Sequence, residues 1–361
     1  MVLGGTHVPI SPWVTQLFSS ILAWPGAWSD EQFENLQFDE LEGIFTDRLN
    51  ELKKYYGKAS GTPIIPVDID LKNFTSDDNV EKLNVALVQN IFPTKETLQT
   101  DHTLIDPCNR RIAHSHLSDL LQMLLKTFKT HSSLTAKSKS INLIVFPELA
   151  IQESDLLVLE RFADKMNSII FCGMIFHRHP EDNDKTVNTG MWIIPQRKDD
   201  RRSFIRLLQG KQHLTEDEIA WGITSYRPVQ WLIRGFADNE LQWTMSASIC
   251  YDATDIKLSA DLRDIVDCYI VSAFNKDIGV FDTMAEAMRY HMFNHTVITN
   301  SGYYGGSTIQ APYAKSYERI LVHTHGKMQA TIALKTLSLK DFDERNDNTK
   351  TPPAGYIKRK K

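Results

Sequence analysis

The chain has few cysteines and no long apolar run. It holds four cysteines in 361 residues, and no two of them form a CxxC pair: Cys108, Cys172, Cys250 and Cys268. Such wide spacing argues against a zinc site or a disulfide framework and is typical of a reducing cytosol. No apolar stretch approaches about 18 residues, and the start lacks a signal-peptide pattern. We therefore expect a soluble cytoplasmic protein with no metal and no organic cofactor.

The chain also lacks a strong charge of one sign. Its net charge is −5, and the only basic run is the last four residues, 358–361. A solvated tail accounts for that run, so the charge pattern favours neither a nucleic acid nor a membrane as partner. Hydrophobic residues make up 42% and charged residues 24% of the chain. This composition predicts a folded protein of one large domain or two smaller ones.

Residues 1–80 read as an N-terminal extension. Between 30 and 56, apolar residues recur at spacings of three and four, which predicts an amphipathic helix that docks on the main domain or on a partner. The stripe consists of Phe38, Leu41, Ile44, Phe45, Leu49 and Leu52. Residues 61–79 contain Pro63, Pro66 and a polar cluster, a composition typical of a linker.

Residues 81–340 read as the main domain, followed by a charged tail at 341–361. Short apolar runs predict strands at 83–89, 141–146, 168–176, 190–195, 204–208, 241–249, 265–274, 296–300, 307–310 and 328–334. Helical periodicity predicts helices at 111–130, 153–166 and 282–295. Several of these strands are apolar throughout, which favours burial on both faces. We expect an α/β fold with mixed sheets covered by helices.

A strand ending on a cysteine dominates the main domain. In 241–249, Trp243, Met245, Ala247 and Ile249 alternate with smaller or polar residues, and Cys250 follows directly. A strand-to-helix turn lifts the sulfur out of the sheet, favours a thiolate and offers backbone N–H groups to an oxyanion. Taken alone, the stretch also fits a small buried cysteine with no chemical role.

Two further residues follow predicted strands. Glu148 comes after an apolar strand and a proline, where a half-desolvated carboxylate has a raised pKa and can act as a general base. Lys211 follows Gly210 at another strand end, where an ammonium can hold an oxyanion. Glu216 or Glu218 could orient that lysine, or both could be first-turn acids of a helix. An exposed loop glutamate and a surface lysine are the alternatives for Glu148 and Lys211.

Together, Glu148, Lys211 and Cys250 form a complete set for acyl transfer through a thioester. The carboxylate would take the thiol proton and the sulfur would attack. The lysine and the Tyr251 N–H would stabilise the oxyanion. Glu148 would then protonate the leaving amine and activate water.

These residues resemble the motifs of the nitrilase superfamily of carbon–nitrogen hydrolases. The resemblance covers about residues 82–335 and rests on Val85–Gln89, Phe146–Glu148, Lys211–Leu214, Cys250–Asp252, Asn300–Gly302 and Gly306–Ile309. It implies an αββα sandwich, a Glu148–Lys211–Cys250 triad, a supporting Glu218 or Glu216, and a homodimer or higher homo-oligomer. The long extension is also similar in layout to nitrilase-like modules fused behind reverse transcriptases in bacterial antiviral systems.

Histidines offer rival sites. His291 and His295 lie four apart on the predicted helix 282–295, a spacing that suits a Cys–His pair or a metal face, although a surface or capping role is favoured. The tract 177–182 contains two histidines and two acids but sits in a polar segment typical of a solvated loop.

The sequence thus predicts a hydrolase of non-peptide C–N bonds, with an amide favoured over a nitrile as substrate. A binding or assembly module with an idle or sensing triad is the alternative. Specificity would lie in the predicted loops 177–188, 221–235 and 276–283. Five aromatic residues are candidates for a pocket lining: Trp221, Tyr226, Phe281, Tyr303 and Tyr304.

Overall fold

We describe the fold from a computed structural model of the chain. The described residues are 59–74, 80, 82–134, 141–198 and 201–342, with Gly43, Thr46, Asp47 and Asn50. The predicted helix at 30–56 lies almost wholly outside them, as does nearly all of the tail 341–361. Within the described part of the chain, no helix combines the length and the apolar character that crossing a bilayer requires.

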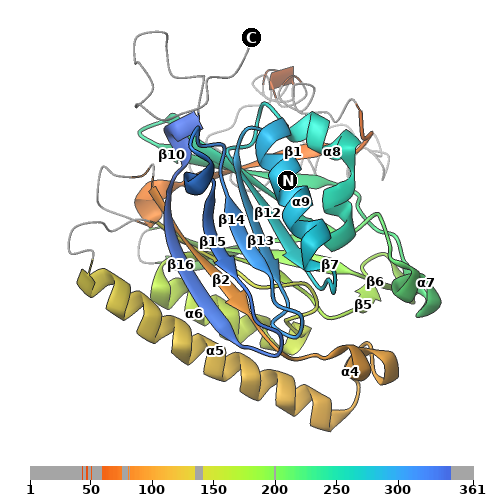
Figure 1. The fold of residues 1–361 in the computed structure, drawn as a ribbon. Helices are drawn as coiled ribbons and strands as arrows, with labels where there is room; N and C mark the ends of the chain where they lie inside the picture. Colours follow the sequence, from red (N-terminus) through yellow and green to blue (C-terminus); the bar gives the residue numbers. More distant parts are fainter. Residues whose placement is uncertain are drawn as a thin grey trace, which may run out of the picture.

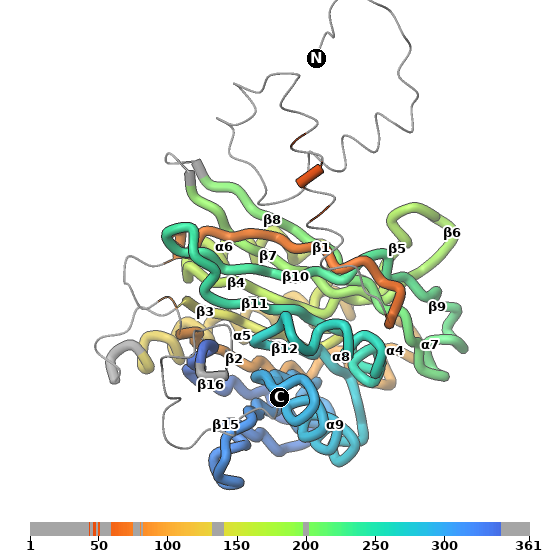
Figure 2. Tube along the Cα trace, turned by 90° about the horizontal axis from the view of Figure 1, so that it is seen from above, coloured from red at the N-terminus to blue at the C-terminus, as the bar shows by residue number. Residues whose placement is uncertain are grey.

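A seven-stranded mixed sheet forms one half of the molecule. Its strands lie in the order β1-β10-β11-β12-β13-β14-β15, and Figure 2 shows β1, β10, β11 and β12 side by side in that order. The bounds are β1 Ile64–Asp70, β10 Gln230–Ala237, β11 Glu240–Ile249, β12 Cys268–Ala273, β13 His295–Asn300, β14 Ser307–Gln310 and β15 Ile320–Thr324. Because β11, β12 and β13 run parallel, their carboxyl ends share one edge of the sheet.

A six-stranded mixed sheet forms the other half, in the order β16-β2-β3-β4-β7-β8. The bounds are β16 Thr331–Ser338, β2 Lys82–Gln89, β3 Ile141–Val145, β4 Ser168–Gly173, β7 Thr189–Lys198 and β8 Arg201–Gly210. The strands β3 and β4 are parallel, and β8 runs in the same direction because two antiparallel pairings separate it from β4. A third sheet of short strands comprises β5 His177–His179, β6 Asp182–Val187 and β9 Ile223–Thr224.

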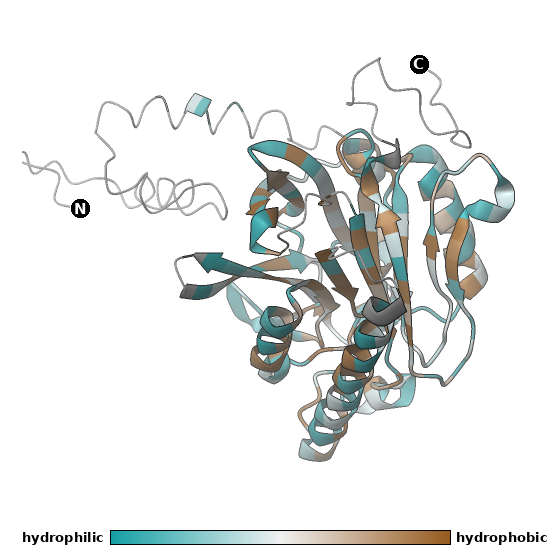
Figure 3. Cartoon of the chain, turned by 90° about the vertical axis from the view of Figure 1, so that its left-hand side faces the viewer, coloured by the Kyte–Doolittle hydropathy of each residue, from teal (hydrophilic) through white to brown (hydrophobic). Residues whose placement is uncertain are grey.

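Helices cover the outer faces of both large sheets (Figure 1). The long α5 (Pro107–Leu134) and α6 (Leu156–Met166) pack on the six-stranded sheet, and α8 (Ile256–Leu262) and α9 (Ile278–His291) pack on the seven-stranded sheet. The short α4 (Lys95–Thr100) and α7 (Glu216–Ala220) lie in connections. Figure 3 shows helices banded in hydrophilic and hydrophobic colours, as expected where one face packs on a sheet. The layers form an αββα sandwich, as predicted.

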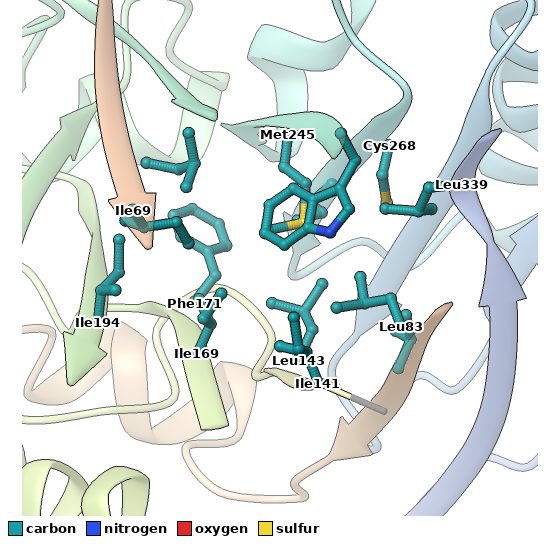
Figure 4. Packing of buried hydrophobic residues seen from close by; sticks show 14 of the residues in the cluster. Ile69, Leu83, Ile141, Leu143, Ile169, Phe171, Ile194, Met245, Cys268 and Leu339 are labelled. Atoms are coloured by element: carbon teal, nitrogen blue, oxygen red, sulfur yellow. The ribbon is translucent and has the colours of Figure 1, made fainter. Parts of the chain in front are cut away.

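Alternating side chains explain why β2 is apolar throughout. Leu83, Val85 and Leu87 enter the core between the two sheets, whereas Ala86 and Val88 enter the core beneath α5 and α6. Figure 4 shows the inter-sheet core, where Ile69, Met245 and Cys268 of one sheet meet side chains of the other. A strand buried on both faces carries apolar side chains on both, so its sequence is a continuous apolar run rather than an alternation.

The prediction of a linker at 61–79 is wrong for residues 64–70. They form β1, which pairs in parallel with β10 at the edge of the seven-stranded sheet and places Val67 and Ile69 in the inter-sheet core. The sandwich therefore begins before residue 81. The helix predicted at 282–295 is α9, which starts four residues earlier and ends at His291, because His295 opens the buried strand β13.

Truncation of Ile69 tests whether β1 belongs to the core. Ile69→Ala should lower the free energy of unfolding by about 2–5 kcal/mol, the usual range for deleting a buried isoleucine side chain. Ile65→Ala, on the same strand but only half buried, should cost clearly less. Urea unfolding of both variants measures the difference. Equal costs would contradict the docking of β1.

Candidate active site

Glu148 lies just beyond the carboxyl end of β3, on a loop that both sheets hold. The Phe146 carbonyl accepts a hydrogen bond of 2.6 Å from Ser272 Oγ on β12, which ties this loop to the opposite sheet. Gly173 passes so close that a Cβ there would stand 2.3 Å from Glu148 Cα. Leu149 adopts a left-handed φ of 59°, and the Glu148 side chain is only 3% exposed. The loop is therefore fixed by close packing.

Lys211 follows β8 at the same edge of the six-stranded sheet. Its side chain is 1% exposed, and its Nζ donates to Glu148 Oε1 at 2.9 Å and to Glu218 Oε1 and Oε2 at 2.8 and 2.7 Å. Gly210 allows this approach, because a Cβ at that residue would lie 1.8 Å from the Tyr226 carbonyl oxygen. A buried ammonium thus sits between two buried carboxylates.

Cys250 reaches the same point from the seven-stranded sheet. It follows β11 directly, has a left-handed φ of 44°, and opens the short 3-10 helix η3 (Cys250–Thr254). Its thiol contacts the Glu148 carboxylate and the backbone N–H of Phe274, which follows β12. The structure therefore brings Glu148, Lys211 and Cys250 together. The adjacent Tyr251 has a half-exposed side chain.

Glu218, rather than Glu216, is the second carboxylate. Glu218 occupies the third position of α7 and forms a capping box with Thr215, whose N–H and Oγ1 donate to Glu218 Oε2 at 2.8 and 3.0 Å. The cap turns its carboxylate inward toward Lys211, whereas Glu216 is exposed. The Thr-x-x-Glu spacing is the sequence signal that separates the two.

Asn188 is a site residue that the sequence analysis missed. It directly precedes β7, and its Nδ2 donates to Glu148 Oε1 at 2.7 Å and to Glu218 Oε1 at 2.6 Å. The buried amide therefore bridges two carboxylates that would otherwise repel each other. An asparagine at the end of a polar segment resembles an ordinary turn residue, so the sequence carries no local signal for this role.

Burial dominates the electrostatics of the site. Burial raises the pKa of Glu148 against the opposing effect of Lys211, and burial with the Glu148 charge raises the pKa of Cys250. Burial alone would lower the pKa of Lys211. The charges of Glu148, Cys250 and Glu218 have a larger opposite effect, so the pKa of Lys211 is raised. Burial alone would also raise the pKa of Glu218, but the charge and hydrogen bonds of Lys211 lower it below its ordinary value. The direction of the Cys250 pKa therefore opposes the expectation that the turn favours a thiolate, because burial and the Glu148 charge both favour the neutral thiol.

Two of the five aromatic candidates pack around Phe274, the residue whose backbone N–H faces the thiol. The Phe274 ring stacks on Tyr303 with centroids 6.4 Å apart and meets Tyr304 edge-on at 5.1 Å. Of the other aromatic candidates, Trp221 stacks on His102 and Tyr226 contacts His179, whereas Phe281 is buried in the core beneath α8 and α9. Tyr303 and Tyr304 are therefore the candidates that contact the residue whose backbone N–H faces the thiol.

The two histidines of the first rival site lie on different elements, because His291 ends α9 and His295 opens β13. Residues 177–182 belong to the hairpin of β5 and β6, and the described residues contain no cluster of three or more His, Cys, Asp or Glu side chains that could hold a metal. The predicted loops 177–188, 221–235 and 276–283 are also partly regular: they include β5 and β6, most of β10, and the start of α9.

Gly173→Ala tests whether close packing fixes Glu148. The new Cβ would collide with the backbone of Pro147 and Glu148, so we expect Glu148 to shift and the alkylation rate of Cys250 to fall at least tenfold, the scale of a misplaced catalytic group. Gly279→Ala, where the nearest contact is 3.7 Å away, is the matched control and should leave the rate unchanged. Unchanged alkylation in Gly173→Ala would show that the loop adapts.

Lys211→Met tests the buried ion pairs. Removing the ammonium leaves two carboxylates buried without a cation, which should cost about 3–5 kcal/mol of the free energy of unfolding at neutral pH. The loss should shrink as the pH falls, because the carboxyl pKa values then lie above their unfolded values and one carboxyl takes up a proton. Urea unfolding at neutral and acid pH measures both effects. Lys185→Met, which removes an exposed pair with Asp182, is the control and should change nothing.

Comparison with known proteins shows which solved structures share this fold. No protein-family model matches the chain, and no curated protein sequence matches it. Among solved structures, Nit3 of Saccharomyces cerevisiae, a member of branch 10 of the nitrilase superfamily, is similar at a TM-score of 0.50 and 15% identity, covering 76% of this chain and 98% of Nit3. A mutant amidase of Nesterenkonia sp. AN1 matches at a TM-score of 0.49 and 12% identity, over 74% of this chain and 94% of the amidase.

The match to Nit3 extends over nearly the whole of that protein, so the shared part is a complete domain rather than a fragment. The chain has the fold of the nitrilase superfamily.

Proposed function

We propose that the protein hydrolyses a non-peptide C–N bond through a thioester on Cys250, and that its substrate is an amide rather than a nitrile. One observation carries the proposal: a buried carboxylate, ammonium and thiol meet where strands of two different sheets end. If the Glu148–Lys211 ion pair served only to stabilise the fold, a thiol in contact with its carboxylate would add nothing to that role. The nitrilase fold supports the same assignment.

Acylation begins with the Glu148 carboxylate as general base. It accepts the proton of the Cys250 thiol while Sγ forms a bond to the amide carbonyl carbon, and the carbonyl electron pair moves onto oxygen. Lys211 Nζ and the Tyr251 N–H stabilise this oxyanion. When the carbonyl re-forms, the C–N bond breaks, and Glu148 gives its proton to the departing amine. The product of this half is a thioester.

Deacylation reverses the roles. Glu148, again ionised, accepts a proton from water as the water oxygen attacks the thioester carbonyl carbon. Collapse of the second oxyanion breaks the C–S bond and releases a carboxylic acid, and the sulfur recovers its proton from Glu148. One carboxyl group thus serves as base and acid in turn. An amide suits this relay because its amine needs one proton to leave.

The polarity of the site matches these roles. A general base works best when its pKa lies near the working pH, and burial moves the pKa of Glu148 upward from the ordinary value of 4.5. Lys211 donates to that carboxylate and favours its ionised form, while Glu218 and Asn188 hold the lysine and the carboxylate in place. The site needs no resident cofactor for this chemistry.

The pH dependence of Cys250 alkylation tests the base. With a small electrophile, the wild-type rate should fall on the acid side as Glu148 takes up a proton, at a pH above that of an ordinary glutamate. Glu148→Gln should lower the rate by at least two orders of magnitude, the usual scale for a general base. Peptide mass spectrometry separates Cys250 from the exposed Cys108, which serves as internal control. Equal rates at the two cysteines would remove the support for an activated thiol.

A panel of amides and nitriles tests the substrate class. We expect turnover of at least one primary amide, an acyl adduct on Cys250 in the intact mass when deacylation is slow, and no turnover by Cys250→Ala. Turnover that survives Cys250→Ala would contradict the thioester. A reactive Cys250 that turns over neither amides nor nitriles would favour the alternative, a binding module whose triad senses a small molecule.

A further inference from the structure

Asp252 is a buried carboxylate that the proposed mechanism does not use. It lies two residues beyond Cys250 in η3, and its side chain is 1% exposed. Its Oδ1 accepts hydrogen bonds from the backbone N–H groups of Gln212 at 3.1 Å and His213 at 2.6 Å, and its Oδ2 accepts from Gln212 N–H at 2.9 Å and Arg227 Nη1 at 3.1 Å. Both oxygens are therefore fully occupied.

The two N–H donors identify what the carboxylate holds. Gln212 and His213 are the residues that directly follow Lys211, which in turn follows β8 of the six-stranded sheet. Asp252 belongs to the turn after β11 of the seven-stranded sheet. One side chain therefore joins the turn of the nucleophile to the loop of the lysine, across the boundary between the two sheets.

Arg227 completes this connection. Its guanidinium is 3% exposed and donates to Asp252 Oδ2 and, through Nη2, to Asp255 Oδ2, each at 3.1 Å. Charge-assisted hydrogen bonds are strong and directional, so they hold the residues that they join in a defined relative position. Asp255 accepts from Arg227 as well, and it caps α8. It meets the loop after Lys211 only through the exposed His213 ring, whose Nε2 lies 3.2 Å from its Oδ2, whereas Asp252 holds the backbone N–H groups of that loop.

We propose that Asp252 is a positioning residue, which holds the Lys211 ammonium at the correct distance from the Cys250 thiol. The inference rests on the proposed function, since it assigns Asp252 a role in the same site. It separates two neighbouring acids. Asp252 sets the geometry between nucleophile and cation through backbone donors, and Asp255 supports α8, Arg227 and the exposed His213 ring.

Asp252→Asn and Asp255→Asn form a matched pair of variants, because both lose one charge that Arg227 contacts. An asparagine at 252 offers one acceptor in place of two and turns an NH₂ group toward donors. We expect the alkylation rate of Cys250 to fall about tenfold to a hundredfold in Asp252→Asn, the scale that a misplacement of about 1 Å produces. Asp255→Asn should stay within twofold of the wild type.

The pH profile separates positioning from simple loss of folded protein. If Lys211 moves away, it no longer offsets the burial of Glu148, so the acid limb of the Cys250 alkylation profile should move to higher pH in Asp252→Asn. A merely structural defect would lower the plateau and leave the limb in place. An unmoved limb, or equal losses in the two variants, would overturn the proposal.

Glu148→Gln, measured in parallel, keeps the two proposals apart. If it alkylates as fast as the wild type, the proposed function fails, whatever Asp252 does. If it is slow while Asp252→Asn is normal, only the positioning role fails.

Amide hydrogen exchange of the wild-type protein tests directly whether Asp252 holds the loop after Lys211. Donors held by a buried carboxylate exchange slowly, so the N–H groups of Gln212 and His213 should be protected at least a hundredfold relative to an unstructured peptide. Exchange at the unprotected rate would overturn the proposal, even if Asp252→Asn does not fold.

Discussion

The site depends on a single ammonium group placed between two buried carboxylates. Removing a carboxylate from water costs several kcal/mol, and two carboxylates side by side also repel each other. Lys211 offsets both penalties for Glu148 and Glu218, and Asn188 donates to the same pair. These contacts require the ends of β3 and β8 and the first turn of α7 to converge. Because these contacts form within the folded chain itself, the arrangement of Glu148, Lys211 and Glu218 needs no ligand to assemble.

The same burial is the largest influence on the pKa values of Glu148 and Cys250. In a low-dielectric interior, a thiolate next to an ionised carboxylate is unfavourable, and Lys211 and the Phe274 N–H work in its favour. Burial therefore raises the pKa values of both the Glu148 carboxyl and the Cys250 thiol. This arrangement differs from a preformed thiolate paired with a histidine, where the nucleophile is already ionised. Under the proposed mechanism, the sulfur gives its proton to Glu148 as it attacks the electrophile, rather than beforehand.

Much of this could be predicted from the sequence, and the exceptions have physical causes. The strand β2 is recognisable because both of its faces are buried, and Glu148, Lys211 and Cys250 are recognisable because each follows a strand. The strand β1 was missed because it is an edge strand, where Pro66 is tolerated and exposed acids such as Asp70 occur. Asn188 could not be predicted, because its importance comes from two carboxylates that lie 40 and 30 residues away in the chain.

The backbone of Cys250 shows how the fold maintains a geometry that the residue alone disfavours. A left-handed φ of 44° costs a residue other than glycine about 1–2 kcal/mol. Such a conformation persists only where its surroundings over-determine it. Strand β11 fixes the residue on one side, and the Asp252 hydrogen bonds to the Lys211 loop fix it on the other. The contacts that hold the strained turn thus also fix the distance between the thiol and the cation, so relaxing the strain would displace the nucleophile.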